Sequence, residues 1–132
     1  MISGDSVKKA YDAMTGTAEK LVDDTEHLLD LARQLQDVLK KAAKALGDSL
    51  DDVAIMGSMI GDYAKGNYKE IPRKTIVSIT VAVVYVVSPI DLIPDCTPVV
   101  GYADDIALVG FVLSQVHEDV DAYREWKKSQ SN

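Results

Sequence analysis

Apolar residues follow a regular spacing of three and four positions along the first third of the chain. The spacing continues through residues 7–46, and Thr25 is its single polar member. Because such intervals place side chains on one face of an α-helix, they predict a long amphipathic helix over residues 1–47. Gly16 is the weak point of this helix, since glycine costs about 1 kcal/mol inside a helix. Gly47 suits its C-terminal end.

The sequence of residues 48–71 indicates a second helix followed by a connector. Ser49 suits the N-cap of this helix, and Gly66 suits its end. Gly57 and Gly61 stand four positions apart on the apolar face, a spacing that allows two helices to approach closely. Because acidic residues flank the pair, we interpret it as a close crossing inside a bundle rather than as contact between membrane helices.

Residues 72–128 predict an apolar helical hairpin that ends in a final helix. Residues 75–87 are rich in Val and Ile and also suit a strand, but no other segment offers a strand partner. We therefore predict a buried helix that opens at Pro72. A loop follows, and the last helix is expected from Ala103–Asp104 to about Lys128. The turn residues of the loop are Pro89, Pro94, Pro98 and Gly101. The predicted fold is an all-α bundle of about four helices in one domain, 1–132.

The apolar hairpin raises the question of membrane contact. Its first uncharged run, 75–90, has 16 residues, whereas a membrane-spanning helix needs about 20. Basic residues precede this run and follow the second uncharged run, 106–116, which is the charge pattern of a hairpin with both ends in the cytoplasm. Three alternatives stay open: a core hairpin, a peripheral or re-entrant membrane contact, and a hairpin that spans the membrane twice.

Composition narrows the function classes. The 132 residues are 47% apolar and carry a net charge of −7, which argues against general binding of nucleic acid, because phosphate backbones require a surplus of Lys and Arg. The single cysteine, Cys96, excludes an internal disulfide and a cysteine-based zinc site. No apolar run of signal-peptide length opens the sequence. We therefore expect a cytoplasmic location, peripheral to a membrane if the hairpin meets one.

The negative charge is unevenly distributed. Residues 75–117 contain no Lys or Arg but four acids, and these account for −4 of the −7. They are Asp91, Asp95, Asp104 and Asp105. Burial of a carboxylate costs several kcal/mol unless the group is paired or hydrogen-bonded. This acidic cluster in an apolar segment is therefore the candidate site.

Two interpretations of the acidic cluster remain. In the first, Asp91 and Asp95 accept backbone N–H groups in turns, while Asp104 and Asp105 cap the last helix. In the second, the four carboxylates, Ser88 and loop carbonyls bind a hard cation, Ca²⁺ or Mg²⁺, because such ions take oxygen ligands. The spacing is not that of an EF-hand, which uses a 12-residue ligand loop.

One motif is distinctive enough to suggest a family. The segment resembles the signature of the YkvA-like family of small bacterial proteins, in the residues Ser88-Pro89-Ile90-Asp91-Leu92-Ile93-Pro94-Asp95, Pro98, Gly101 and Asp104-Asp105. The resemblance covers about residues 74–116. It implies a helical hairpin, membrane association in many members, and no assigned enzymatic activity.

Two functions follow as hypotheses. The first is a non-catalytic helical module that binds a protein partner or a second copy of itself through the 7–46 helix, at a membrane surface or away from one. The second is a small divalent-cation-binding domain, regulatory or catalytic, centred on the acidic cluster. The sequence contains no nucleophile elbow, phosphate-binding loop or zinc-protease motif, which favours the non-catalytic alternative.

Overall fold

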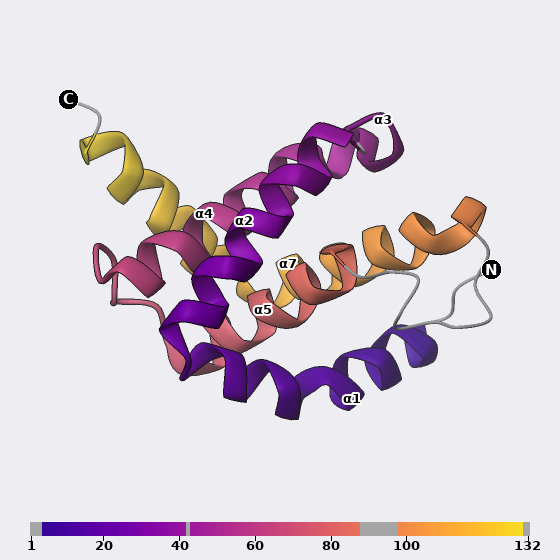
Figure 1. The fold of residues 1–132 in the computed structure, drawn as a ribbon, viewed down its shortest axis with the longest axis horizontal. Helices are drawn as coiled ribbons and strands as arrows, with labels where there is room; N and C mark the ends of the chain where they lie inside the picture. Colours follow the sequence, from indigo (N-terminus) through magenta and orange to yellow (C-terminus); the bar gives the residue numbers. More distant parts are fainter. Residues whose placement is uncertain (1–3, 42, 88–97, 131–132) are drawn as a thin grey trace.

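The computed structural model describes residues 4–41, 43–87 and 98–130, and their backbone is almost entirely helical (Figure 1). The all-α prediction is therefore confirmed. The helices, in chain order, are α1 (Gly4–Val22), α2 (Thr25–Lys41), α3 (Ala43–Leu46), the short 3-10 helix η1 (Gly47–Ser49), α4 (Leu50–Lys65), α5 (Arg73–Val87) and α7 (Pro98–Gln130).

Helix α5 forms the centre of the bundle. It contacts α1, α2, α4 and α7, and in Figure 1 it lies between the diverging α1 and α2. Eleven of its fifteen residues are buried, which explains why its sequence lacks the polar face of the other helices. The segment that also suited a strand is thus a core helix, as predicted.

Three polar side chains are nevertheless buried in α5, and each of them is hydrogen-bonded. Thr80 donates to the carbonyl of Ile76 at 2.7 Å, one helical turn earlier. Ser78 donates to the carbonyl of Lys74 at 2.9 Å. Thr75 donates to the Asp119 carboxylate of α7 at 2.5 Å. Satisfying these hydroxyl groups removes most of the cost of burying them.

The structure corrects the prediction of one continuous helix through residues 7–46. The chain turns at Asp23–Asp24, between α1 and α2, and not at Gly16. Asp24 caps α2, because its carboxylate accepts the backbone N–H of His27 at 3.2 Å and contacts the His27 ring nitrogen at 2.6 Å. This turn lets α1 pack on α5 while α2 packs on α4. Both apolar faces are then buried within one chain, including Ala18 and Leu28.

Gly47, predicted at the end of the first helix, follows α3, and Gly66, predicted at the end of the second, follows α4, whereas the predicted N-cap Ser49 differs. Gly47 has φ +55° and Gly66 has φ +81°, a left-handed conformation that glycine adopts easily. The Gly66 N–H returns to the carbonyl of Tyr63 at 3.1 Å, which closes the helix. Ser49 does precede α4, but its side chain makes no capping hydrogen bond. The 3-10 turn before α4 places Ser49 in a helical conformation, so it cannot act as a conventional N-cap.

Gly57 lies where α4 crosses α2. A Cβ at this position would come within 2.4 Å of Leu35 Cδ2, whereas a Cβ at Gly61 would meet nothing within 4 Å. The close crossing predicted from the glycine spacing therefore depends on Gly57. Within residues 4–41, 43–87 and 98–130, no helix is both long and apolar enough to cross a membrane.

Candidate functional site

The predicted acidic cluster falls largely beyond what the structure describes. Asp91 and Asp95 of the cluster lie outside the described residues, as do the motif residues Ser88, Pro89 and Pro94. The side chains of Asp104 and Asp105 also lie outside that description. The structure therefore does not test the cation site, and Ca²⁺ or Mg²⁺ binding stays a prediction.

The backbone of α7 corrects two details of this motif. The helix begins at Pro98, earlier than the predicted start at Ala103–Asp104, so Pro98 and Gly101 belong to its first turn rather than to the loop. Proline suits the first turn of a helix because the N–H it lacks would have no partner there. Asp104 and Asp105 consequently lie beyond the first turn and cannot cap the helix start.

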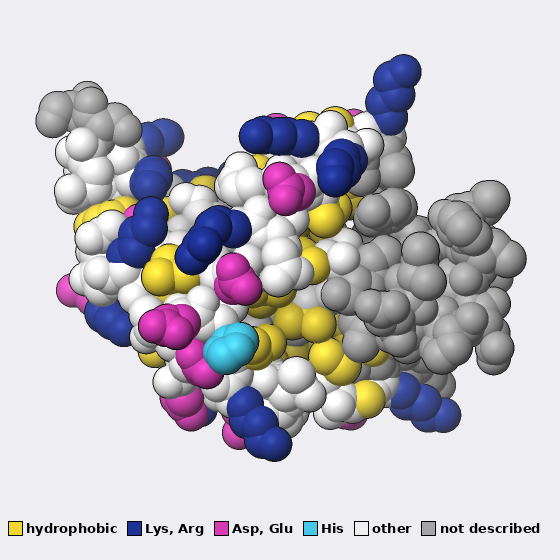
Figure 2. All heavy atoms as spheres, viewed as in Figure 1, with side chains coloured by type: hydrophobic (Ala, Val, Ile, Leu, Met, Phe, Trp, Pro, Cys, Tyr) yellow, Lys and Arg dark blue, Asp and Glu magenta, His cyan; other side chains and the backbone are white. Residues whose placement is uncertain are grey.

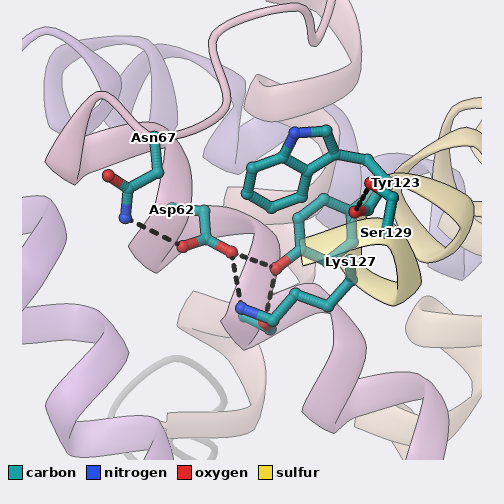
Figure 3. Close-up of polar contacts among 7 residues, drawn as sticks. Asp62, Asn67, Tyr123, Lys127 and Ser129 are labelled. Atoms are coloured by element: carbon teal, nitrogen blue, oxygen red, sulfur yellow. Dashed lines mark hydrogen bonds and ion pairs between the residues drawn. The ribbon is translucent and has the colours of Figure 1, made fainter. Parts of the chain in front are cut away.

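A different carboxylate, Asp62 of α4, is the centre of the best-connected polar cluster among the described residues. Asp62 is only 8% exposed, and three side chains donate to it (Figure 3). Tyr123 of α7 makes a very short hydrogen bond to Oδ2, and Lys127 binds the same oxygen at 3.0 Å. Asn67, just after α4, donates to Oδ1 at 3.3 Å. The cluster thus joins the end of α4 to the second half of α7.

The hydrogen bonds of this cluster have a defined direction. Because the Tyr123 hydroxyl donates to Asp62, its oxygen accepts from Ser58, whose hydroxyl lies 2.5 Å away. Ser58 and Asp62 stand one turn apart on α4, and Tyr123 and Lys127 stand one turn apart on α7. The two helices therefore contribute matching pairs to one network, which fixes their relative rotation.

The surroundings set the ionisation states. Burial raises the pKa of Asp62, but the hydrogen bonds from Tyr123, Lys127 and Asn67 outweigh this effect and hold the pKa below its ordinary value. Burial raises the pKa of Tyr123, and its hydrogen bond to the Asp62 carboxylate raises it further. At neutral pH the carboxylate is therefore ionised and the phenol is protonated.

Aromatic rings pack against this network. The ring of Tyr68 lies edge-on to Tyr123, with centroids 5.2 Å apart, and 4.8 Å from the ring of Trp126. Trp126 stacks on Tyr123 at 5.7 Å. Because Trp126 is the single tryptophan of the chain, its fluorescence reports on this cluster.

The cluster borders an open groove of about 470 Å³. Its lining residues come from α2, α4 and α7 and include Gly57 and Gly61. Three cationic side chains line it, one from each helix: Arg33, Lys65 and Lys127. The volume is in the range of small-molecule sites, and the basic residues favour an anionic ligand. Among the described residues, no group of three or more His, Cys, Asp or Glu side chains is arranged to hold a metal ion.

The sequence analysis treated Asp62 only as one of the acidic residues that flank Gly57 and Gly61, so it missed the cluster. The partners of Asp62 on α7 lie 61 and 65 positions away in sequence, which no local pattern reveals. The available signal was the four-residue spacing of polar residues on each helix, Ser58 with Asp62 and Tyr123 with Lys127.

The family match to known proteins concerns the hairpin rather than this groove. Residues 75–111 match a family described as "Protein of unknown function (DUF1232)". Over 69 residues the chain is 32% identical to the "Uncharacterized membrane protein YkvA" of Bacillus subtilis (strain 168), and this alignment covers 52% of the chain and 65% of that relative. No solved structure matches the chain. The predicted resemblance to the YkvA-like family, whose function is unknown, is thereby confirmed for this part of the chain.

Proposed function

We propose that the protein is a non-catalytic helical module that docks peripherally on an anionic membrane surface. The observation that carries this proposal is the convergence of cations from three helices, Arg33, Lys65 and Lys127, on one groove of an otherwise acidic protein. Arg124 and Lys128 line a second hollow that shares Lys127 with the groove. These five side chains form what we term the basic face.

The charges are unevenly distributed over the face drawn in Figure 2. Lys and Arg side chains predominate over α2 and the ends of α4 and α7, with some acidic side chains among them, and several Asp and Glu side chains gather near the turn between α1 and α2. An anionic surface would therefore attract the basic face and repel the region of the turn. This polarity gives the module a preferred orientation despite its net charge of −7.

The expected attraction is modest. Each Lys or Arg near an anionic membrane contributes about 1 kcal/mol. Three cations of the basic face already pair with acids, however: Arg124 with Asp52, Lys127 with Asp62 and Lys128 with Glu125. These acids offset part of the attraction. Binding should therefore be reversible and sensitive to salt. The relative in Bacillus subtilis is named a membrane protein, which is compatible with such a contact.

The fold bears on the hypothesis that residues 7–46 bind a protein partner or a second copy of the chain. A protein partner or a second copy could use α1 and α2, but a continuous seam over residues 7–46 is interrupted by the turn at 23–24. We therefore place the membrane contact on the basic face instead. Binding to another protein is an outcome of the test below.

Vesicle flotation tests the proposal. The full chain should float with phosphatidylcholine vesicles that contain phosphatidylglycerol, and not with pure phosphatidylcholine vesicles or in high salt. The double variant Lys65→Glu, Lys128→Glu should lose this binding. Lys8→Glu, Lys9→Glu is the matched control, because both residues are exposed on α1 and the change in net charge is the same.

Equal flotation of both double variants would exclude the basic face. Absence of flotation for the wild-type chain, together with self-association in light scattering, would replace the membrane by a second copy of the chain. The divalent-cation alternative is separate: calorimetry with Ca²⁺ and Mg²⁺ should give heat that Asp91→Asn, Asp104→Asn removes while the fold persists. Unchanged heat in that variant would remove the acidic cluster as the ligand.

A further inference from the structure

The groove lined by α2, α4 and α7 differs from a general basic surface, because it combines cationic side chains with apolar ones. Its cations are Arg33, Lys65 and Lys127, and its apolar lining comes from Leu29 and Ala32 of α2. A simple anion uses only the charge. A ligand that carries an anionic head on an apolar stem uses both parts of this lining.

The cations of the groove are only partly neutralised by the protein. Among the described residues, Lys65 forms no ion pair. Arg33 reaches Asp30 only at 3.8 Å, and both side chains are more than half exposed, so this pair is weak. Lys127 forms an ion pair with Asp62 at 3.0 Å, so the positive charge of Lys127 is offset by the negative charge of Asp62. The groove therefore retains net positive charge for a ligand.

The carboxylate of Asp62 does not block an anion from this groove. Its two oxygens accept hydrogen bonds from Tyr123, Lys127 and Asn67, and these donors screen its charge. The same contacts fix Lys127 at the groove wall. Asp62 consequently acts as a positioning residue for the cation.

The two glycines that line the groove differ in their surroundings. Gly57 lies at the crossing with α2, since a Cβ there would come within 2.4 Å of Leu35 Cδ2. Gly61 has no such neighbour, because a Cβ there would meet nothing within 4 Å. The empty space above Gly61 is thus part of the groove rather than of the helix crossing.

We propose that this groove binds the phosphodiester headgroup of a single anionic phospholipid, with the phosphate near Arg33, Lys65 and Lys127 and the glycerol stem along Leu29 and Ala32. This inference rests on the proposed function, because it names the lipid group that the basic face would select. The basic face alone would attract any anionic surface without saturating, whereas the groove would bind one lipid molecule saturably.

Titration with a soluble short-chain phospholipid tests the groove without a membrane. Dihexanoyl phosphatidylglycerol, kept monomeric, should change the fluorescence of Trp126 saturably, since the Lys127 ammonium of the groove lies 5.9 Å from the centre of the Trp126 ring. The Gly61→Leu variant fills the groove and should weaken this binding about tenfold or more. Gly16→Leu is the matched control: the same substitution at a helical glycine with open space, on the distant α1.

Two further probes identify the source of the phosphate. Dihexanoyl phosphatidylcholine has the same stem but a zwitterionic head, and it should bind at least several-fold more weakly. Inorganic phosphate lacks the stem and should also bind more weakly. Equal affinity for inorganic phosphate would overturn the lipid assignment in favour of a free-phosphate site.

The vesicle experiment separates failure of this inference from failure of the proposed function. If Gly61→Leu binds the short-chain lipid as tightly as the wild-type chain, the groove is not the site, even when vesicle flotation persists. If flotation fails while the short-chain lipid still binds at the groove, the peripheral membrane function is wrong and the binding site remains. Thermal unfolding of both leucine variants shows whether either result comes from loss of fold.

Discussion

Two contacts between helices in this molecule use similar polar groups in different surroundings. Between α1 and α5, Tyr11 donates to Ser78 at 2.6 Å, and the pair of Asp23 and Arg73 is more than half exposed on both sides. Between α4 and α7, Tyr123 donates to the buried carboxylate of Asp62. The comparison teaches that exclusion of water, more than the number of bonds, decides how strongly a polar contact holds two helices together.

The largest expected effect comes from removing the buried carboxylate. Asp62→Ala should lower the free energy of unfolding by about 3 kcal/mol, because Tyr123 loses a charged acceptor in a site that water reaches poorly. Urea denaturation followed by circular dichroism measures this change. Asp23→Ala is the control on the exposed side and should change stability far less. A similar loss in the two variants would remove the distinction between the contacts.

Acid should weaken the α4–α7 contact in a defined pH range. The pKa of Asp62 is lowered in the folded protein relative to its ordinary value of 3.8. Its contribution to stability is therefore complete above that value and is lost as pH falls through the lowered pKa. The difference in unfolding free energy between the wild-type chain and Asp62→Asn should shrink over this range. A difference independent of pH from 5 to about 2 would contradict this linkage.

The α4–α7 and α1–α5 contacts can be compared directly by removing one tyrosine hydroxyl from each. Tyr123→Phe should cost about 2 kcal/mol, because the hydrogen bond goes to a buried charge, whereas Tyr11→Phe should cost about 1 kcal/mol for a neutral bond. Each substitution removes one oxygen and keeps the ring, so packing is preserved in both. Chemical denaturation of the two variants gives the ratio, and an equal cost would count against a special role of the ionised partner.

The sequence predicted the helices well because their apolar spacing is a local property. The turn at 23–24 was missed because the spacing continues from Leu21 through Thr25 to Leu28 in the same phase. Whether such a stretch stays straight or folds back depends on what its two halves contact. Here α1 meets α5 and α2 meets α4, and this information lies far along the chain.

The Asp62 cluster could not be predicted from the sequence because it, too, depends on contacts between distant helices. An isolated Asp62 in the sequence is compatible with a solvated helix face, and its burial depends on α7 lying across the end of α4. The acidic motif, in contrast, was recognised from contiguous residues, and the hairpin resemblance was confirmed over residues 75–111. Local motifs therefore revealed the resemblance to the family over residues 75–111, while the groove required the tertiary arrangement.

The smallest expected effect lies at the exposed pair of Asp23 and Arg73. The guanidinium donates to both carboxylate oxygens, at 2.8 and 3.1 Å, and its hydrogen bonds lower the pKa of Asp23. Both groups are nevertheless solvated, so water replaces most of what the pair provides. Arg73→Gln should shift the melting temperature slightly at low salt and not at high salt, because salt screens exposed charges. Asp62→Asn should keep its destabilisation in both buffers, since a buried contact is screened much less. A salt-independent loss for Arg73→Gln would show that this pair also excludes water, and the comparison between the two contacts would then fail.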